Sequence, residues 1–354
     1  AELGMFNPMM IVPGTSAAVA GALLAMPGAV KKLLRCATRQ GDTQHGLSLL
    51  FCLVHKCGAR GAAAVAAARG WLTRLLVVAR SQPRSLMGAV MVVNLMRDDA
   101  PQVVAAAVHS EPRALAASAK LLACREPWAE RLGMLLLNDA LRQEAWPARA
   151  RTLESVARAV KAAPGALEGA VNALRSRLDR DTSPVPTISG RLFSPSRDAA
   201  QAAAAEVLAA LAPALPPALL CSTPDLLSSL ASLVGKMEAA ARALDDITRL
   251  GGEEACAAVL RSAPELLSAL SAAEAGGGDA GAAGLAARLR LRLEHQQRRA
   301  GQLQDKVCAV CGRDAGDGVK LRVYCSEACA KSAWRGGHKA ECGQLRQARG
   351  QKGQ

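Results

Sequence analysis

Six residues near the end of the chain are types that zinc prefers as ligands. They come in closely spaced pairs: Cys308 and Cys311, Cys325 and Cys329, and His338 and Cys342. Two thiolates from one turn can bind the same tetrahedral Zn2+, with Zn–S bonds of roughly 2.3 Å. The two cysteine pairs therefore predict a four-cysteine site with no open coordination position. Closed sites of this kind are structural rather than catalytic.

The residues around these ligands resemble a MYND-type zinc finger. In that family a Cys-x2-Cys opening is followed by Tyr-Cys-x3-Cys, then a Trp, then an ending of His-Lys-x2-Cys. The same features occur here in the same order, with Tyr324 before Cys325, then Trp334, then His338 followed by Lys339. The resemblance covers residues 308–342 and implies a module that binds other proteins.

The chain departs from the family at the second zinc site. The family has a further Cys-x2-Cys pair just before its Tyr-Cys, whereas residues 312–324 contain no cysteine or histidine. The resemblance thus implies one complete site and leaves His338 and Cys342 as the remnant of a second. Asp314 or Asp317 could complete that remnant, but aspartates in a Gly-rich turn are usually solvated. We expect one Zn2+; the alternatives are two, or reduced cysteines without metal.

The resemblance also implies a kind of partner. MYND fingers often bind short Pro-rich peptides, and several act as adaptors in transcriptional repression. Trp334 and Tyr324 would contribute to such a peptide-binding surface. The family often has a Gln directly after its sixth cysteine, where this chain has Ala330. We therefore expect protein partners, with Pro-rich peptides as one class to test.

The remaining residues predict an all-α fold. Apolar residues make up 51% of the chain but aromatic residues only 2%, so alanine, leucine and valine supply most of the apolar side chains. Ala and Leu are strong helix formers, and an Ala-rich interior lets helices pack closely. The alternating β-branched and aromatic residues that mark strands are nearly absent.

A short pattern recurs within this helical region: small or apolar residues, a proline, and a leucine-led apolar helix. Its copies centre on Pro83, Pro112, Pro164, Pro224 and Pro264. Because proline fits the first turn of a helix but not its interior, each copy indicates a helix end and a new helix start. Stacked helix pairs of this kind form solenoids, so we expect an irregular armadillo- or HEAT-like solenoid. Only Pro224 to Pro264 comes near the roughly 40-residue period of such repeats, and an irregular bundle is the alternative.

Changes in composition divide the chain into segments. In order, we expect a helical-repeat segment at 1–181, a Ser/Pro-rich loop at 182–197, a second helical-repeat segment at 198–273, a Gly/Ala linker at 274–284, a basic amphipathic helix at 285–307, the finger at 308–342 and a disordered basic tail at 343–354.

The charge of the C-terminal region supports an alternative partner. The chain has a formal net charge of +14, and residues 285–354 hold 15 Lys and Arg against 6 Asp and Glu. A basic helix beside a zinc module could bind phosphate backbones without sequence specificity. Nucleic-acid contact is therefore the alternative to protein binding.

A membrane segment is less favoured. Residues 3–30 carry no charged side chain and are long enough to span a bilayer. However, Pro13 and Pro27 interrupt this stretch. We expect a helix of the solenoid there.

The sequence contains no recognisable catalytic motif. It has no phosphate-binding Gly loop, no His-Glu-x2-His and no Gly-x-Ser-x-Gly nucleophile elbow. Some MYND modules lie within SET-domain lysine methyltransferases, but the Asn-His-x-Cys strand of that family is missing and Tyr324 is the sole tyrosine. We therefore expect no enzymatic activity, with a SET-type fragment as the least favoured alternative.

The other cysteines lie in apolar helical context, where a free cysteine behaves as a small buried hydrophobic residue. They are Cys36, Cys52, Cys57, Cys124, Cys221 and Cys256. Unpaired cysteines together with zinc-spaced thiols indicate a reducing compartment, the nucleus or the cytoplasm. The sequence as a whole favours an intracellular, non-catalytic adaptor that binds Zn2+ and protein partners.

Overall fold

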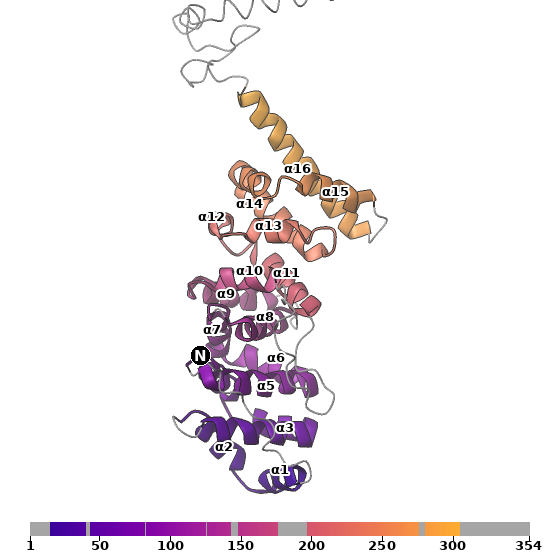
Figure 1. The fold of residues 1–354 in the computed structure, drawn as a ribbon. Coiled ribbons are helices and arrows are strands. Elements are labelled where there is room, and N and C mark those ends of the chain that lie inside the picture. The colour runs from indigo at the N-terminus through magenta and orange to yellow at the C-terminus, as the bar shows by residue number, and fades with distance from the viewer. Residues whose placement is uncertain are drawn as a thin grey trace, which may run out of the picture. The chain divides into compact units, whose positions relative to one another are not determined.

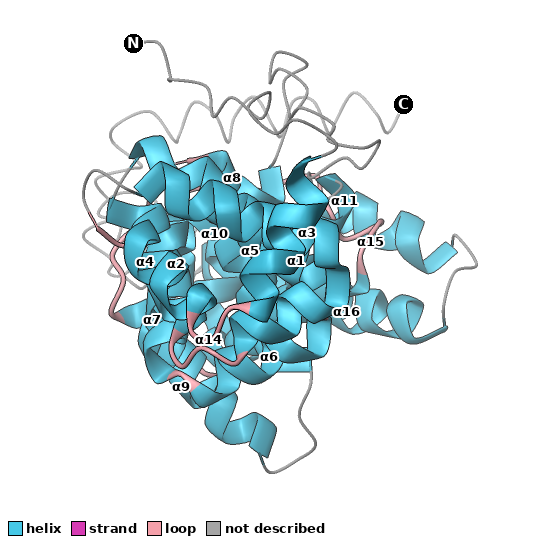
Figure 2. Cartoon of the chain, turned by 90° about the horizontal axis from the view of Figure 1, so that it is seen from below, coloured by secondary structure: helices cyan, strands magenta, loops and turns pink. Residues whose placement is uncertain are grey.

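The computed structural model describes residues 15–39, 43–81, 83–124, 126–142, 148–175, 197–275 and 280–304. Within these ranges the chain consists of helices joined by short turns and loops, and no strand is present (Figure 2). The predicted all-α class is confirmed for the part of the chain that the structure describes. The arrangement is compatible with a helical solenoid.

Sixteen helices are described, and Figure 1 shows their arrangement. They are α1 (Thr15–Ala25), α2 (Ala29–Ala37), α3 (Thr43–Ala66), α4 (Trp71–Ser81), α5 (Pro83–Asp99), α6 (Pro101–Ser110), α7 (Pro112–Leu122), α8 (Pro127–Arg142), α9 (Ala148–Lys161), α10 (Ala166–Arg175), α11 (Arg197–Leu211), α12 (Pro217–Ser222), α13 (Leu226–Ala231), α14 (Glu238–Ser262), α15 (Leu266–Ala275) and α16 (Ala280–Gln304).

Proline begins several of these helices. Pro101, Pro112 and Pro217 lie in the first turn of α6, α7 and α12, whose N-cap residues make no side-chain cap hydrogen bond. Proline suits this position because its ring fixes φ near the helical value. Its missing N–H would also have no acceptor within the helix.

The helices up to Leu289, which form one compact unit, pack in two series that follow the order of the chain. In the first series α2, α4, α7, α10 and α13 each contact the next member. In the second series α3, α5, α8, α11 and α14 do the same. Each member of the first series also packs against the following member of the second, so these ten helices form two layers.

Six turns with one common hydrogen bond lie at the start of α2, α4, α7, α10, α13 and α15. In each turn a backbone N–H donates to the carbonyl three residues earlier, at 2.7–3.4 Å: Ala29 to Met26, Trp71 to Ala68, Ala114 to Glu111, Ala166 to Ala163, Leu226 to Thr223, and Leu266 to Ala263. Four turns have a positive φ at their third residue: Gly28, Gly70, Gly165 and Asp225. With ψ of 4° at Gly28 and 1° at Asp225, these two are type II turns.

These turns account for most of the predicted proline pattern. Four of its five prolines lie in them, whereas Pro83 begins α5 instead. The second residues of the six turns are Pro27, Arg69, Pro112, Pro164, Pro224 and Pro264. The first two intervals are 42 and 43 residues and the last is 40. The two longer intervals contain residues 143–147 and 176–196, which lie outside the described residues.

Two glycines bend long helices without an intervening loop. Gly58 within α3 has φ 51° and ψ −132°, and Gly252 within α14 has φ 59° and ψ −140°. This mirror image of the β region is open to glycine because it has no Cβ. Each bend therefore divides one long helix into a member of the second series and a shorter helix that leads to the next turn.

Specific contacts join neighbouring helices of each series. Arg97 on α5 donates from Nε to Oδ2 of Asp139 on α8 at 2.6 Å, and from Nη2 to Oδ1 at 3.2 Å. In the first series, Gly169 of α10 lies against the end of α7. A Cβ added at Gly169 would lie 1.9 Å from the carbonyl oxygen of Leu122. Glycine is therefore required for this close approach.

The N-terminal apolar stretch is divided rather than continuous. Helices α1 and α2 meet at an angle of 112° across the turn at Pro27 and Gly28. Among the described helices, α3 has the length and apolar composition of a membrane span, and α1 and α2 would qualify only if counted together. Leu50, Phe51 and Leu53 of α3 are fully buried among the other helices.

Other predicted segments lie partly outside the described residues. Of the predicted Ser/Pro-rich loop, the structure describes Arg197, which begins α11. Of the predicted linker at 274–284, residues 274–275 end α15 and residues 280–284 begin α16, where alanine favours helix. Residues 285–304 continue α16, and Arg290 begins a second compact unit.

Candidate functional site

The predicted zinc ligands lie outside the described residues. They are Cys308, Cys311, Cys325, Cys329, His338 and Cys342. The predicted contact residues Tyr324 and Trp334 also lie there. The structure describes the second unit as far as Gln304, where Arg290 forms an ion pair of 2.8 Å with Glu294. The zinc site stays a prediction from the spacing of its ligands.

Within the described ranges, no group of three or more His, Cys, Asp or Glu residues could hold a metal ion. The six cysteines found there are free thiols, of which Cys52 and Cys256 are buried and the other four are half-buried. Of the six, Cys52 and Cys256 are therefore buried in the way expected of small hydrophobic residues. Burial raises the pKa of the Cys52, Cys124 and Cys221 thiols, which keeps them protonated at neutral pH.

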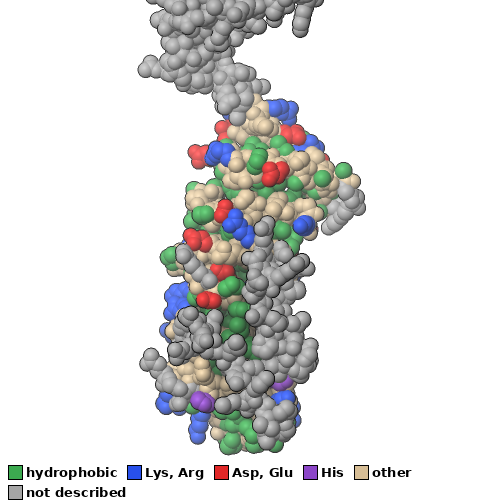
Figure 3. All heavy atoms as spheres, in the orientation of Figure 1, with side chains coloured by type: hydrophobic (Ala, Val, Ile, Leu, Met, Phe, Trp, Pro, Cys, Tyr) green, Lys and Arg blue, Asp and Glu red, His purple; other side chains and the backbone are tan. Residues whose placement is uncertain are grey.

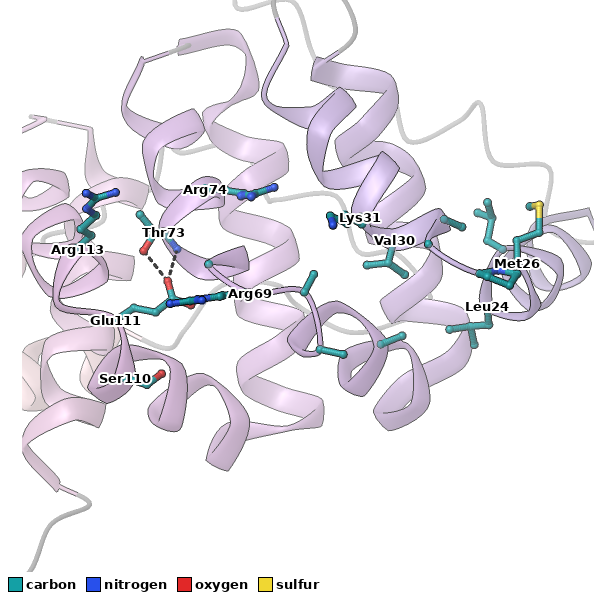
Figure 4. A pocket seen from close by; sticks show the side chains of 18 of the residues that line it. Leu24, Met26, Val30, Lys31, Arg69, Thr73, Arg74, Ser110, Glu111 and Arg113 are labelled. Atoms are coloured by element: carbon teal, nitrogen blue, oxygen red, sulfur yellow. Dashed lines mark hydrogen bonds between the residues drawn. The ribbon is translucent and has the colours of Figure 1, made fainter.

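A cavity of about 1150 Å³ lies along three successive turns, those before α2, α4 and α7 (Figure 4). Its walls comprise residues 23, 24 and 26–31 around the first turn, residues 64, 67–70, 73 and 74 around the second and residues 110–113 at the third. We call this cavity the turn groove. The packing of α2, α4 and α7 in series brings these three segments together, although each is separated from the next by about forty residues.

A carboxylate is fixed in the turn groove. Oε2 of Glu111 accepts hydrogen bonds from the backbone N–H of Thr73 at 3.3 Å and from its Oγ1 at 2.5 Å. These bonds hold the third turn to the start of α4, as Figure 4 shows. Because both donors are neutral, the negative charge of Glu111 remains as one feature of the groove.

Four basic side chains line the same cavity: Lys31, Arg69, Arg74 and Arg113. None of them has an ion pair or side-chain hydrogen bond with another residue that the structure describes. In Figure 4 the three arginines surround the Thr73–Glu111 pair, and Lys31 lies between them and the first turn. Four cations against one carboxylate give the lining an excess of positive charge.

The start of the first-series helices adds to this positive potential. Helices α2, α4 and α7 have no acidic residue in their first turns. At α2 no acidic side chain of the first turn neutralises the partial positive charge of the helix N-terminus, whereas at α4 the Glu111 carboxylate opposes it by accepting a hydrogen bond from the N–H of Thr73.

The opposite end of the turn groove is apolar. Leu23, Leu24, Met26 and Val30 line it, and Met26 is 52% exposed. Figure 4 shows Leu24, Met26 and Val30 grouped away from the arginines. The groove thus has a basic part and an apolar part within one cavity.

This site was not predicted from the sequence, although the distribution of charge along the chain carries a signal for it. Residues 1–97 contain 11 Lys and Arg but only Glu2 and Asp42 as acidic residues, an excess comparable to that of the C-terminal region. In Figure 3 the end of the first unit formed by α1–α3 shows Lys and Arg side chains, whereas Asp and Glu appear over later helices. A charge count along the chain would have located the basic region but not the cavity.

A second cavity, of about 620 Å³, lies near the turns before α10 and α13 and has the opposite charge. Glu130, Glu168 and Asp225 line it, and Arg175 forms an ion pair of 2.8 Å with Asp225. Glu130 is only 5% exposed and accepts a hydrogen bond of 2.9 Å from Nδ2 of Asn172. Burial raises the pKa of the Glu130 carboxyl, although the Asn172 hydrogen bond partly opposes this shift.

Comparison with protein-family models, with curated proteins and with solved structures finds no match to this chain.

Proposed function

We propose that this protein is a non-catalytic adaptor that binds other proteins through a helical-repeat scaffold and a zinc-stabilised MYND-like finger. The observation that carries the proposal is the recurrence of a turn closed by the same backbone hydrogen bond at the start of successive first-series helices. Such a series presents a row of turns and an extended surface to solvent. Proteins built from stacked helical units use surfaces of this kind for binding.

The intervals between turns support an armadillo- or HEAT-like repeat. Intervals of 42, 43 and 40 residues lie within the roughly 40–47 residues typical of these repeats. The contacts within each series and between paired members support the same reading, because each repeat of a solenoid contacts its neighbours in the chain.

The finger at residues 308–342 is proposed from its sequence. Cys308, Cys311, Cys325 and Cys329 would hold one Zn2+, and His338 and Cys342 would be the remnant of a second site. A four-cysteine site has no open position, so the metal would stabilise the module rather than take part in a reaction. The free thiols of the helical part agree with the proposed nuclear or cytoplasmic location.

Zinc stoichiometry of the purified full chain tests the finger. We expect one Zn2+ per chain, lost in Cys325→Ser and kept in Cys57→Ser, a matched control on the half-buried Cys57 of α3. Two Zn2+ per chain would mean that further ligands complete the site of His338 and Cys342. No zinc in the unmodified chain would overturn the finger and leave the helical scaffold alone.

Peptide binding tests the adaptor role. We expect a Pro-rich peptide to bind the zinc-loaded chain with little dependence on salt, and Trp334→Ala to weaken this binding. The alternative function is nonspecific nucleic-acid contact through the basic C-terminal region, where α16 carries Arg288, Arg292 and Arg298. That alternative predicts binding to an oligonucleotide that weakens steeply as salt rises, since counterions are released from the phosphates.

A further inference from the structure

We propose that the turn groove binds an acidic segment of a partner protein, with an apolar side chain of that segment beside its acidic residues. This inference rests on the proposed adaptor function, because it names the chemistry of a partner for the helical scaffold. It concerns a different part of the chain from the finger, so the two can fail separately.

Among the described residues, the basic side chains of the groove have no ion-pair partner. Lys31, Arg69, Arg74 and Arg113 come from three segments far apart in the chain, yet line one cavity. The structure gives them no acidic partner among the described residues. Like charges gathered in this way repel one another, so an anionic ligand would relieve the repulsion as well as form new ion pairs.

The wider charge distribution would assist association. Residues 1–97 hold 11 Lys and Arg against two acidic residues. Summed charge of one sign around a cleft raises the local concentration of an oppositely charged ligand and increases its association rate. The acidic segment would therefore be attracted to this end of the scaffold before it makes specific contacts.

The lining favours a peptide over a nucleic acid. Proteins that bind single strands place aromatic side chains against the bases, and none of the described residues that line the turn groove is aromatic. The fixed carboxylate of Glu111 would repel a continuous phosphate backbone. A peptide can avoid Glu111, because its acidic residues are spaced and alternate with neutral ones.

The apolar part of the groove would contact the apolar side chain of the partner segment. Leu23, Leu24 and Met26 are close enough to the arginines to line the same cavity, and Met26 is half exposed. Burying an aliphatic side chain there contributes binding energy that salt does not screen. The cavity of about 1150 Å³ exceeds the roughly 300–1,000 Å³ of typical small-molecule sites, which favours a segment of several residues.

Fluorescence anisotropy with the zinc-loaded full chain tests the proposal. The probe is a labelled peptide of alternating Glu and Gly with one Leu, compared with the same peptide carrying Gln in place of Glu. A third peptide carries Ser in place of Leu. We expect the first peptide to bind most tightly, because only it satisfies both the basic and the apolar parts.

Matched charge variants identify the binding surface. The double variant Arg69→Ala/Arg74→Ala removes two groove cations, while Arg80→Ala/Lys120→Ala removes two exposed cations that do not line the groove. The basic C-terminal region stays intact in both, so its attraction for the peptide cancels in the comparison. We expect the groove variant to bind roughly three- to tenfold more weakly than the control variant. Unfolding curves would show that both variants are folded.

Several results would overturn the inference. The first is an equal loss of peptide affinity in the two double variants, and the second is equal affinity for the Glu and Gln peptides. The third is the absence of peptide binding. The fourth is displacement of the labelled peptide by a single-stranded oligonucleotide at a lower concentration than by unlabelled peptide. If the groove variants do not change affinity for the acidic peptide while Trp334→Ala abolishes binding of a Pro-rich peptide, the adaptor function is supported and the groove inference is overturned. If the purified chain holds no zinc but binds the acidic peptide through the groove, the finger is overturned and the groove inference is supported.

Discussion

Replacement of Gly58 by alanine tests how α3 is bent. Gly58 has φ 51° and ψ −132°, a conformation that L side chains avoid. A Cβ added there would meet no atom within 4 Å, so no steric clash contributes. The expected cost is therefore backbone strain alone, about 1–3 kcal/mol for a residue held in a sparsely populated region.

Two comparison variants separate this strain from other effects of losing a glycine. Gly21 lies within α1, and a Cβ there would also meet nothing within 4 Å. Gly21→Ala should be neutral or stabilise the protein by up to about 1 kcal/mol, because alanine loses less backbone entropy on folding. Gly28→Asn should cost less than Gly58→Asn. Asn tolerates the left-handed conformation of Gly28, which Asp225 adopts in the corresponding turn, but not the ψ of Gly58.

Chemical denaturation followed by circular dichroism at 222 nm would measure these differences. Heating gives a second readout, because each 1 kcal/mol lowers Tm by roughly 2–4 °C in a domain of this size class. If Gly58→Ala is as stable as Gly21→Ala, the helix does not bend at Gly58 as described. The division of α3 into a second-series helix and a shorter helix would then be wrong.

Two other contacts give testable changes in stability. Burial raises the pKa of Glu130 above its ordinary value of 4.5, so the folded state favours the protonated carboxyl. The free energy of unfolding therefore decreases as pH rises through the raised pKa, because the carboxyl must then ionise in a buried position. Glu130→Gln should therefore be more stable than the unmodified chain at pH 7.5, with the difference shrinking toward pH 4; a constant difference in Tm would contradict this. Arg97→Ala breaks two hydrogen bonds to Asp139 and should cost about 1.5–3 kcal/mol, because these bonds join charged groups that are only about one-fifth exposed. Asp139→Ala should cost little more once Arg97 is gone, and strictly additive losses in urea denaturation would show that the pair is not coupled.

The helical class could be predicted because it depends on composition that is local to each helix. Ala and Leu dominate the apolar residues, and proline marks helix starts such as that of α7 at Pro112. The turn at Arg69 and Gly70 was not predicted, because it satisfies the same backbone requirement without a proline. Nor was the bend at Gly58, since the residues on both sides continue the same apolar helical pattern. The repeat spacing was obscured by the longer intervals that follow Pro112 and Pro164.

The zinc site can be predicted from the sequence, whereas the turn groove cannot. The zinc ligands lie within 35 residues, so their spacing alone predicts a common metal without knowledge of the fold. The turn groove has no such local signature. Lys31, Arg69 and Arg113 come together only because three turns stack in series, and their register depends on the packing of α2, α4 and α7. Charge counting locates the basic region, but only the packing shows which cations share a cavity.

The charge of the two cavities also determines how a partner would lie along the turns. The turn groove, near the turns at the start of α2, α4 and α7, has an excess of cations. The cavity near the turns before α10 and α13 contains three carboxyl groups, those of Glu130, Glu168 and Asp225, against one cation, Arg175, which is paired with Asp225. An acidic segment bound at the first would be repelled if its acidic residues continued to the second. A segment that spans both must therefore become neutral or basic at one end, and reversing that pattern should prevent it from binding across both cavities. The direction of binding would thus be set by charge, before any side chain of the partner is recognised individually.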